Sequence, residues 1–247
     1  MSPTGRAEAS RGRPGARVWW VAFVVLALIV AGIGAWMWTR PPAEYTPATP
    51  TPTPTPTPSI PPIARQEVWT SDTPASGTYL LNTITAQPGI EAPKTVKYVV
   101  KVEDTTEVKP DEAAAEVQKT FDDPRGWAGY GKRNFTLVND ELEAALVLYI
   151  ASPKTANELC KPADVESKWN CRVGDRVVLN SDRWRFMTPT YDDLGVYRSY
   201  LVNHEVGHYL GQGHVGCPKA GAKAPVMMQQ SIDMAGCVPN AWPKDAD

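Results

Sequence analysis

Runs of apolar residues predict three strands between residues 97 and 180. Residues 97–103 (KYVVKVE) combine β-branched and aromatic side chains, a composition that favours a strand. Residues 144–151 (AALVLYIA) and 175–180 (DRVVLN) are apolar runs of strand length, and the first is expected to be buried on both faces. The pattern therefore predicts a β-sheet.

Two longer stretches repeat their apolar positions at helical spacing. From Pro110 to about Phe121, the proline suits a first turn and apolar residues recur three or four positions apart. A second helix is expected from near Asp193 to Gly211. Its apolar residues lie on more than one side, which is typical of a buried helix. Gly207 costs this helix up to ~1 kcal/mol relative to alanine, so a closely packed neighbour is expected there.

The N-terminus contains a different pattern, an apolar span without charges at residues 18–38. It is long enough to cross the hydrocarbon core of a bilayer, and tryptophans stand at both ends as in an interfacial belt. Four arginines precede the span and one follows it directly, so the positive-inside rule leaves residues 1–17 in the cytoplasm. We expect a signal anchor, single-pass in the cell membrane, with the C-terminal domain extracellular. A cleaved signal peptide, with a weak site at residues 33–35, is the alternative.

Residues 39–62 are expected to be a Pro/Thr-rich linker, because closely spaced prolines block helices and sheet ladders and favour extended polyproline II. The rest, residues 63–247, is long enough for one extracytoplasmic domain. Without the five arginines and two acidic residues of the first 62 positions, it has a net charge of −5. This charge gives no support for binding to nucleic acid or to an anionic surface. We expect a monomeric domain.

All three histidines of the chain lie in residues 204–214, HEVGHYLGQGH. On a helix, residues four apart share a face, so His204 and His208 can present ring nitrogens to one ion. Gly211 readily adopts the left-handed conformation that ends helices, which would return His214 to the same ion. Three imidazoles with one open position are the ligand set of a catalytic zinc, so Zn²⁺ is the expected cofactor. Glu205, offset by about a quarter turn, is better placed to meet a metal-bound water than the metal.

The pattern His204-Glu205-x-x-His208-x-x-Gly211-x-x-His214 resembles the extended zinc signature of the metzincin metallopeptidases. The resemblance implies an α+β, zincin/metzincin-like fold with a mixed sheet, an active-site helix and an irregular C-terminal subdomain. It also implies a methionine turn beneath the metal. Residues 224–228 (APVMM) are the candidate turn, with Met227 favoured and Met228 close behind.

A closer resemblance, over residues 98–243, is to an uncharacterised family of secreted actinobacterial domains with a metzincin-like motif. The segments that carry it are DPRGW (123–127), LNxxRW (179–184), VNHEVGH (202–208) and PNxWP (239–243). The resemblance implies the fold and not a substrate. Two features differ from characterised peptidases. Val215 follows the third histidine, where several families carry a polar residue, and no tyrosine lies just after the candidate methionine turn.

Four cysteines, all in the exported part, suggest two disulfides with three possible connectivities. We favour the sequential pairs. Cys160–Cys171 would close a short loop, and Cys217–Cys237 would staple the segment that holds the third histidine and the candidate methionine turn. A cysteine zinc site is not expected, because no close CxxC pair is present.

Together these features predict a membrane-anchored, extracytoplasmic zinc metallopeptidase that acts on a peptide or protein substrate. The zinc would activate water, and Glu205 would act as general base and then pass the proton to the leaving amine. The alternative is a zinc-containing, cell-wall-associated binding or scaffolding module without turnover. The sequence names no substrate.

Overall fold

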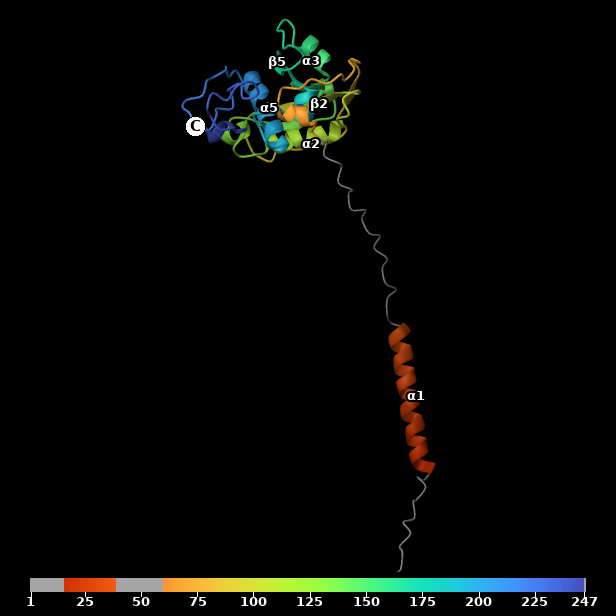
Figure 1. Cartoon of the computed structure of the whole chain (residues 1–247). Helices are drawn as coiled ribbons and strands as arrows, with labels where there is room; N and C mark the ends of the chain where they lie inside the picture. Colours follow the sequence, from red (N-terminus) through yellow and green to blue (C-terminus); the bar gives the residue numbers. More distant parts are fainter. Residues whose placement is uncertain (1–15, 39–59, 247) are drawn as a thin grey trace, which may run out of the picture. The chain divides into compact units, whose positions relative to one another are not determined.

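The computed structural model describes residues 16–38 and 60–246, drawn in colour in Figure 1. These two ranges belong to two separate compact units. The expected cytoplasmic tail (1–17) and the expected linker (39–62) lie outside the described residues, apart from residues 16–17 and 60–62.

The described part of the first unit is the helix α1 (Ala16–Trp38). Its described side chains, at Trp20, Val21 and residues 23–32, are exposed. Among the residues that the structure describes, no helix is long and apolar enough to cross a membrane. The membrane span expected at residues 18–38 is not supported by this finding and remains a prediction.

The second unit is built on a six-stranded mixed sheet with the order β1-β2-β4-β6-β5. Its central strands are parallel: β2 (Thr95–Glu103), β4 (Leu146–Ala151) and β6 (Arg176–Asn180). On one side of β2, β3 (Asn134–Leu137) pairs parallel with its first half and β1 (Tyr79–Leu81) antiparallel with its last residues. β5 (Cys171–Val173) is antiparallel to β6 and forms the far edge.

The three strands predicted from the sequence are the three central strands. In β4, Leu146, Leu148 and Ile150 are fully buried, whereas Val147 and Tyr149 on the other face are half-buried. The expectation that this strand is buried on both faces is therefore wrong for its second face. That face is covered only in part, by the short helix α3 (Pro153–Leu159) and the loop after it.

Helices α2 (Pro110–Phe121) and α5 (Leu194–Tyr209) pack on the first face of the sheet (Figure 1). The apolar side of α2 meets Tyr98 and Phe135, and burial of side chains of this size stabilises by roughly 1.5–3 kcal/mol each. The predicted bounds of α2 are confirmed. α5 begins directly after Asp193 and ends two residues before Gly211, and it is buried on both predicted apolar sides.

A short helix, α4 (Ser181–Phe186), leads from β6 toward α5. It begins where the side chain of Asn180 accepts a hydrogen bond from the amide of Asp182. The remaining helical turns are of the 3₁₀ type: η1 (Pro62–Arg65), η2 (Trp127–Tyr130), η3 (Glu141–Glu143) and η4 (Pro243–Asp245).

The folded unit includes residues that were expected to belong to the linker. Ile60 is partly buried against the main core, and Ala64 is 1% exposed. Farther along, the amide and hydroxyl of Ser71 donate to the Asp182 carboxylate at 2.6 and 2.7 Å. The domain therefore starts no later than residue 60, three residues before the predicted boundary.

The chain after α5 is irregular. Among its described residues, η4 and an isolated bridge between Lys223 and Val238 are the only regular structure. The molecule is thus an α+β protein with a mixed sheet, a central buried helix and an irregular C-terminal segment, as predicted at this level.

Candidate metal centre

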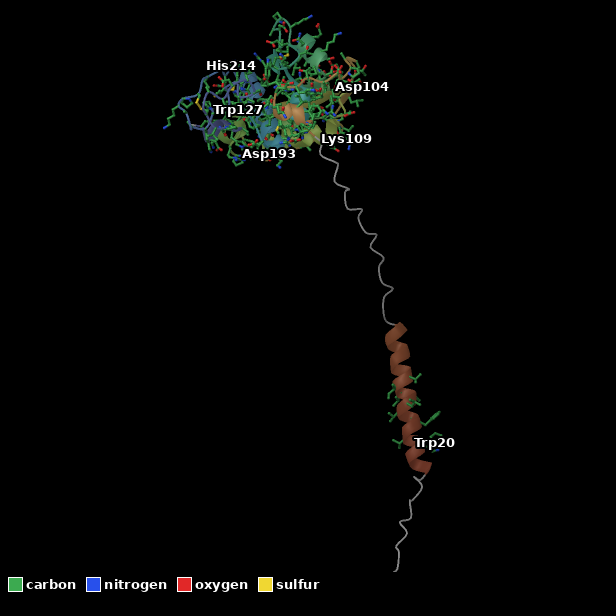
Figure 2. All side chains as sticks on the ribbon, in the orientation of Figure 1. Trp20, Asp104, Lys109, Trp127, Asp193 and His214 are labelled. Atoms are coloured by element: carbon green, nitrogen blue, oxygen red, sulfur yellow. A yellow bond between two sulfur atoms is a disulfide. The ribbon has the colours of Figure 1, made fainter. Side chains whose placement is uncertain are left out.

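The helix that carries the histidine motif has a defined start and end. Asp193 caps its N-terminus by accepting a hydrogen bond from the amide of Val196. At the other end Gly211 has a φ of +91°, and its amide donates to His208 while that of Gln212 donates to Gly207. This pair of bonds is a Schellman motif, the glycine-dependent helix end predicted from the sequence. Figure 2 labels Asp193, at the start of this helix, and His214, beyond its end.

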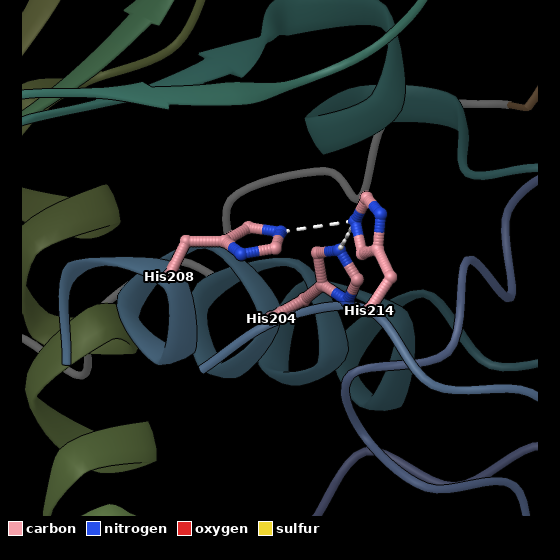
Figure 3. Close-up of side chains that lie close together, drawn as sticks. All are labelled: His204, His208 and His214. Carbon is pink, nitrogen blue, oxygen red and sulfur yellow. Dashed lines mark hydrogen bonds between the residues drawn. The ribbon is translucent and has the colours of Figure 1, made fainter. Parts of the chain in front are cut away.

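The reversal after Gly211 brings the third histidine onto the other two (Figure 3). The Nε2 atom of His214 lies 3.3 Å from that of His204 and 3.0 Å from that of His208. All three imidazoles therefore present the same ring nitrogen to one point. His204 is buried, His208 half-buried and His214 exposed, so the point lies at the surface of the domain.

The hydrogen bonds of the other ring nitrogens fix the tautomers of the two helix histidines. His204 Nδ1 lies 2.8 Å from the carbonyl oxygen of Val226, and His208 Nδ1 lies 2.9 Å from that of Gln212. Because a carbonyl only accepts, both Nδ1 atoms donate, which leaves an electron pair on each Nε2. A carbonyl partner of this kind is what orients the imidazole ligands of metal sites.

This donor set fits a zinc ion. Four ligands at about 2.0–2.1 Å in a tetrahedron place their atoms ~3.3 Å apart, close to the two separations from His214 Nε2. All three ligand nitrogens lie within 4.8 Å of one another. The two electron pairs of His204 and His208 face His214 Nε2, which carries at most one hydrogen. A cation between the three nitrogens would satisfy all of them at once.

Glu205 lines the same cavity as the three histidines. Its residue is 5% exposed, and its Oε2 atom has no hydrogen-bond partner among the described residues. Burial therefore raises the pKa of Glu205 to about 8. The carboxylate is placed, as predicted, beside the ligand cluster and not within it.

Burial also acts on the imidazoles. It lowers the pKa of His204 to about 3, against the hydrogen bond to Val226 and together with repulsion from His208 and His214. The pKa of His214 is lowered as well, by burial and by His208. These shifts favour the neutral rings that metal ligation requires.

The three histidines line a cavity of about 620 Å³. Its wall includes residues of the segment Ala163–Arg172, which ends in β5, and the lining is completed by Gln229, Ser231 and Ile232 among others. A cavity of this size beside a cluster of polar groups is the usual setting of a ligand or active site.

A family model for proteins of unknown function, DUF3152, matches residues 70–243, which is more than half of the chain. This chain belongs to the DUF3152 family. A comparison with curated proteins found no match.

The segment Val226–Met228 of this DUF3152 domain joins the parts of the site together. Val226 accepts from His204, the Met227 carbonyl accepts from the amide of Val215 at 3.2 Å, and the Met228 carbonyl accepts from the Tyr200 hydroxyl at 2.9 Å. Sequence reasoning named the two methionines but missed Tyr200 and the backbone partners. A carbonyl contact has no signature in the sequence, since every residue carries one.

The two methionines have different surroundings. Met227 belongs to the main core, and its sulfur packs on α5 at Gly207. Met228 packs instead beside Cys237 in a small separate cluster. Met227 is therefore the methionine under the histidine helix, the one favoured from the sequence.

Gly207 has the close neighbours that were predicted. A Cβ atom built there would lie 2.3 Å from the Met227 sulfur and 2.9 Å from the Trp127 ring. Trp127 also donates its indole hydrogen to the carbonyl of Asn203, at 2.8 Å. Its role beside the helix was not predicted, although the DPRGW segment had been singled out.

Both sequential disulfides are present, Cys160–Cys171 and Cys217–Cys237. The second joins the segment after His214 to the segment after the methionines, as expected. The first closes the loop that forms one wall of the cavity, which was not foreseen. The disulfides are typical of an extracellular domain.

Proposed function

We propose that this domain is a zinc-dependent peptidase of the metzincin type. The observation that carries the proposal is the position of His214 Nε2, 3.3 and 3.0 Å from the Nε2 atoms of His204 and His208, in a cavity that the buried carboxyl group of Glu205 also lines. The buried helix, the glycine reversal and the methionine packed beneath the helix support the same assignment.

His204, His208 and His214 would hold the ion. When bound, zinc supplies Lewis acidity that polarises a substrate carbonyl and makes water more acidic. The positive charge of a bound ion would lower the pKa of Glu205 again and keep it ionised. The Glu205 carboxylate would then take a proton from the attacking water as general base and return it to the leaving amine. The hydrolysis thus adds the hydroxyl of water to the carbonyl carbon and its proton to the nitrogen. Val226 and Gln212 keep the two helix imidazoles in the required tautomer throughout.

We further propose that the domain acts outside the cell, held at the membrane by the apolar segment at residues 18–38. The two disulfides support an extracellular place. The anchor rests on the uncharged sequence and on the arginines before it.

Zinc binding is tested first. Purified residues 60–247 should contain about one equivalent of zinc, and His214→Ala should weaken binding strongly under competition with a chelator. A His214→Ala protein that retains zinc as well as the wild type would remove this residue from the site.

Turnover is tested with Glu205→Gln, which preserves shape and removes the base. We expect unchanged zinc content and a loss of cleavage of about a hundredfold or more on a proteome-derived peptide mixture. Glu143→Gln, on the surface and paired with Lys97, is the matched control and should be fully active. Zinc-loaded wild-type protein that cleaves nothing, or that cleaves no faster than Glu205→Gln, would favour the binding or scaffolding module.

A further inference from the structure

The cavity wall carries one positive charge, at Arg172. This residue is the middle of β5, the edge strand, and its side chain is exposed and lines the cavity. Among the described residues it forms neither an ion pair nor a side-chain hydrogen bond. No other arginine or lysine among the described residues lines the cavity.

The sheet register fixes the direction of this side chain. Arg172 is paired with Val177 across the ladder, and Val177 is fully buried in the core between the sheet and α5. Paired residues of antiparallel strands point to the same face. Arg172 therefore points to the face where the histidine helix lies. The disulfide at Cys171 and the β5–β6 ladder hold its backbone in place.

Neither Asp164 nor Asp175 forms an ion pair with Arg172. Asp164 also lines the cavity, but one of its carboxylate oxygens accepts from the amide of Glu166 within its own loop. Asp175, in the turn after β5, forms no ion pair within the described part of the chain. A guanidinium in this position has donors free for a planar, two-pronged acceptor.

We propose that Arg172 is a specificity-determining residue that selects a carboxylate in the bound peptide. The proposal rests on the proposed function for its peptide ligand, but it requires binding only and no turnover. Two sources of the carboxylate are possible, an acidic side chain or a free C-terminus, and both have the geometry that a guanidinium binds in pairs of hydrogen bonds.

The experiment measures binding to zinc-loaded Glu205→Ala protein, so that no cleavage occurs. The probes are peptides that are acetylated and amidated and differ only by Glu or Gln at one position at a time. A second set compares free with amidated C-termini. We expect a Glu-over-Gln or free-over-amidated preference of about five- to tenfold. Arg172→Gln should abolish it, and Arg172→Lys should keep part of it.

Arg133→Gln is the matched control, because it removes the same charge from a residue that does not line the cavity. It should leave the preference unchanged. A preference equal in the Arg172→Gln and parent proteins, or lost equally in the Arg133→Gln protein, would overturn the proposal. Melting temperature and zinc content should not change in Arg172→Gln, since the side chain is exposed and unpaired.

The outcome separates the two proposals. If the wild type cleaves no peptide but the carboxylate preference depends on Arg172, the peptidase fails and the assignment of Arg172 stands. If the wild type cleaves peptides and Arg172→Gln does not change the carboxylate preference, the assignment of Arg172 fails and the peptidase stands.

Discussion

At the scale of single residues, Gly207 lies between two ligand candidates on α5, where no room exists for a methyl group. In Gly207→Ala, the new carbon would meet the Met227 sulfur and the Trp127 ring below contact distance. Overpacking of this kind costs about 1–3 kcal/mol, more than the helix gains from alanine. We expect a lower melting temperature. We also expect weaker zinc binding, because any movement of the helix backbone at Gly207 would displace His204 and His208 on either side of it.

The control for this change is Gly216→Ala, near the same site. A Cβ atom there meets nothing within 4 Å, so melting temperature and zinc affinity should stay near those of the wild type. If Gly207→Ala is as stable as Gly216→Ala, the close packing of Met227 and Trp127 against Gly207 is not needed for stability.

Glu103 gives a second prediction at this scale, away from the site. Its fully buried carboxylate accepts from the amides of Ser76, Gly77 and Ser152 and from the hydroxyl of Thr155, at 2.7 to 2.8 Å. It joins the end of β2 to the start of α3 and to the loop before β1. Glu103→Gln should cost about 1–3 kcal/mol at neutral pH, measured by urea unfolding.

The pH dependence of this cost follows from the pKa of Glu103. Burial by itself raises that pKa, but the hydrogen bonds from Gly77, Ser152 and Thr155 outweigh burial and hold it below the usual value. The unfolded chain titrates near ~4.3. The ionised carboxylate therefore stabilises the fold above that pH, and the contribution is lost as the pH falls through the lower folded value. The difference in unfolding free energy between the wild type and Glu103→Gln should therefore become smaller in acid. A difference that grows as the pH falls would contradict this prediction.

At the scale of elements, the sequence was most informative where an apolar repeat ran over many residues or where a residue type favours one structural position. The α2 bounds followed from Pro110 and an apolar repeat, and the end of α5 followed from Gly211. The short β1, β3 and β5 were missed, because three or four residues do not establish an alternation. They exist because β2 and β6 offer open edges to pair with.

The candidate site could be predicted in the same way and to the same limit. His204, His208, His214 and Glu205 share a local spacing, so one stretch of sequence brought them together. Tyr200 lies on α5 itself, four residues before His204, but its hydrogen bond to the Met228 carbonyl has no signature in the sequence. Arg172 and Trp127 come from distant segments. Only the sheet register and the packing of α5 place them near the histidines.

The two disulfides allow a comparison between elements. Loss of either pair, as a double Cys→Ser variant, should cost up to ~3 kcal/mol of stability. Loss of Cys217–Cys237 should also weaken zinc binding, because it loosens the segments next to His214 and Met228. Loss of Cys160–Cys171 should instead weaken peptide binding, because this bond closes the cavity wall. Equal losses of zinc affinity in the two variants would refute this division of roles.

At the scale of the whole molecule, the family match and the apolar N-terminal segment concern different parts of the chain. The family match covers residues 70–243 and so includes the histidines, both disulfides and the cavity wall. It leaves out α1 and the residues up to 69. The reaction of the domain and its cellular location are therefore separate questions. The location can be determined without knowing the substrate.

The place of the domain is tested with the full chain in cells. Four arginines before the apolar segment and one directly after it predict a cytoplasmic N-terminus and an external C-terminal domain. Protease added to intact cells should digest the domain and spare a cytoplasmic control, and the intact chain should stay with the membranes in alkaline carbonate. Chain found only in the medium, with an N-terminus near residue 36, would show a cleaved signal peptide instead. A domain protected until the cells are lysed would contradict export itself, and with it the oxidising compartment in which its two disulfides form.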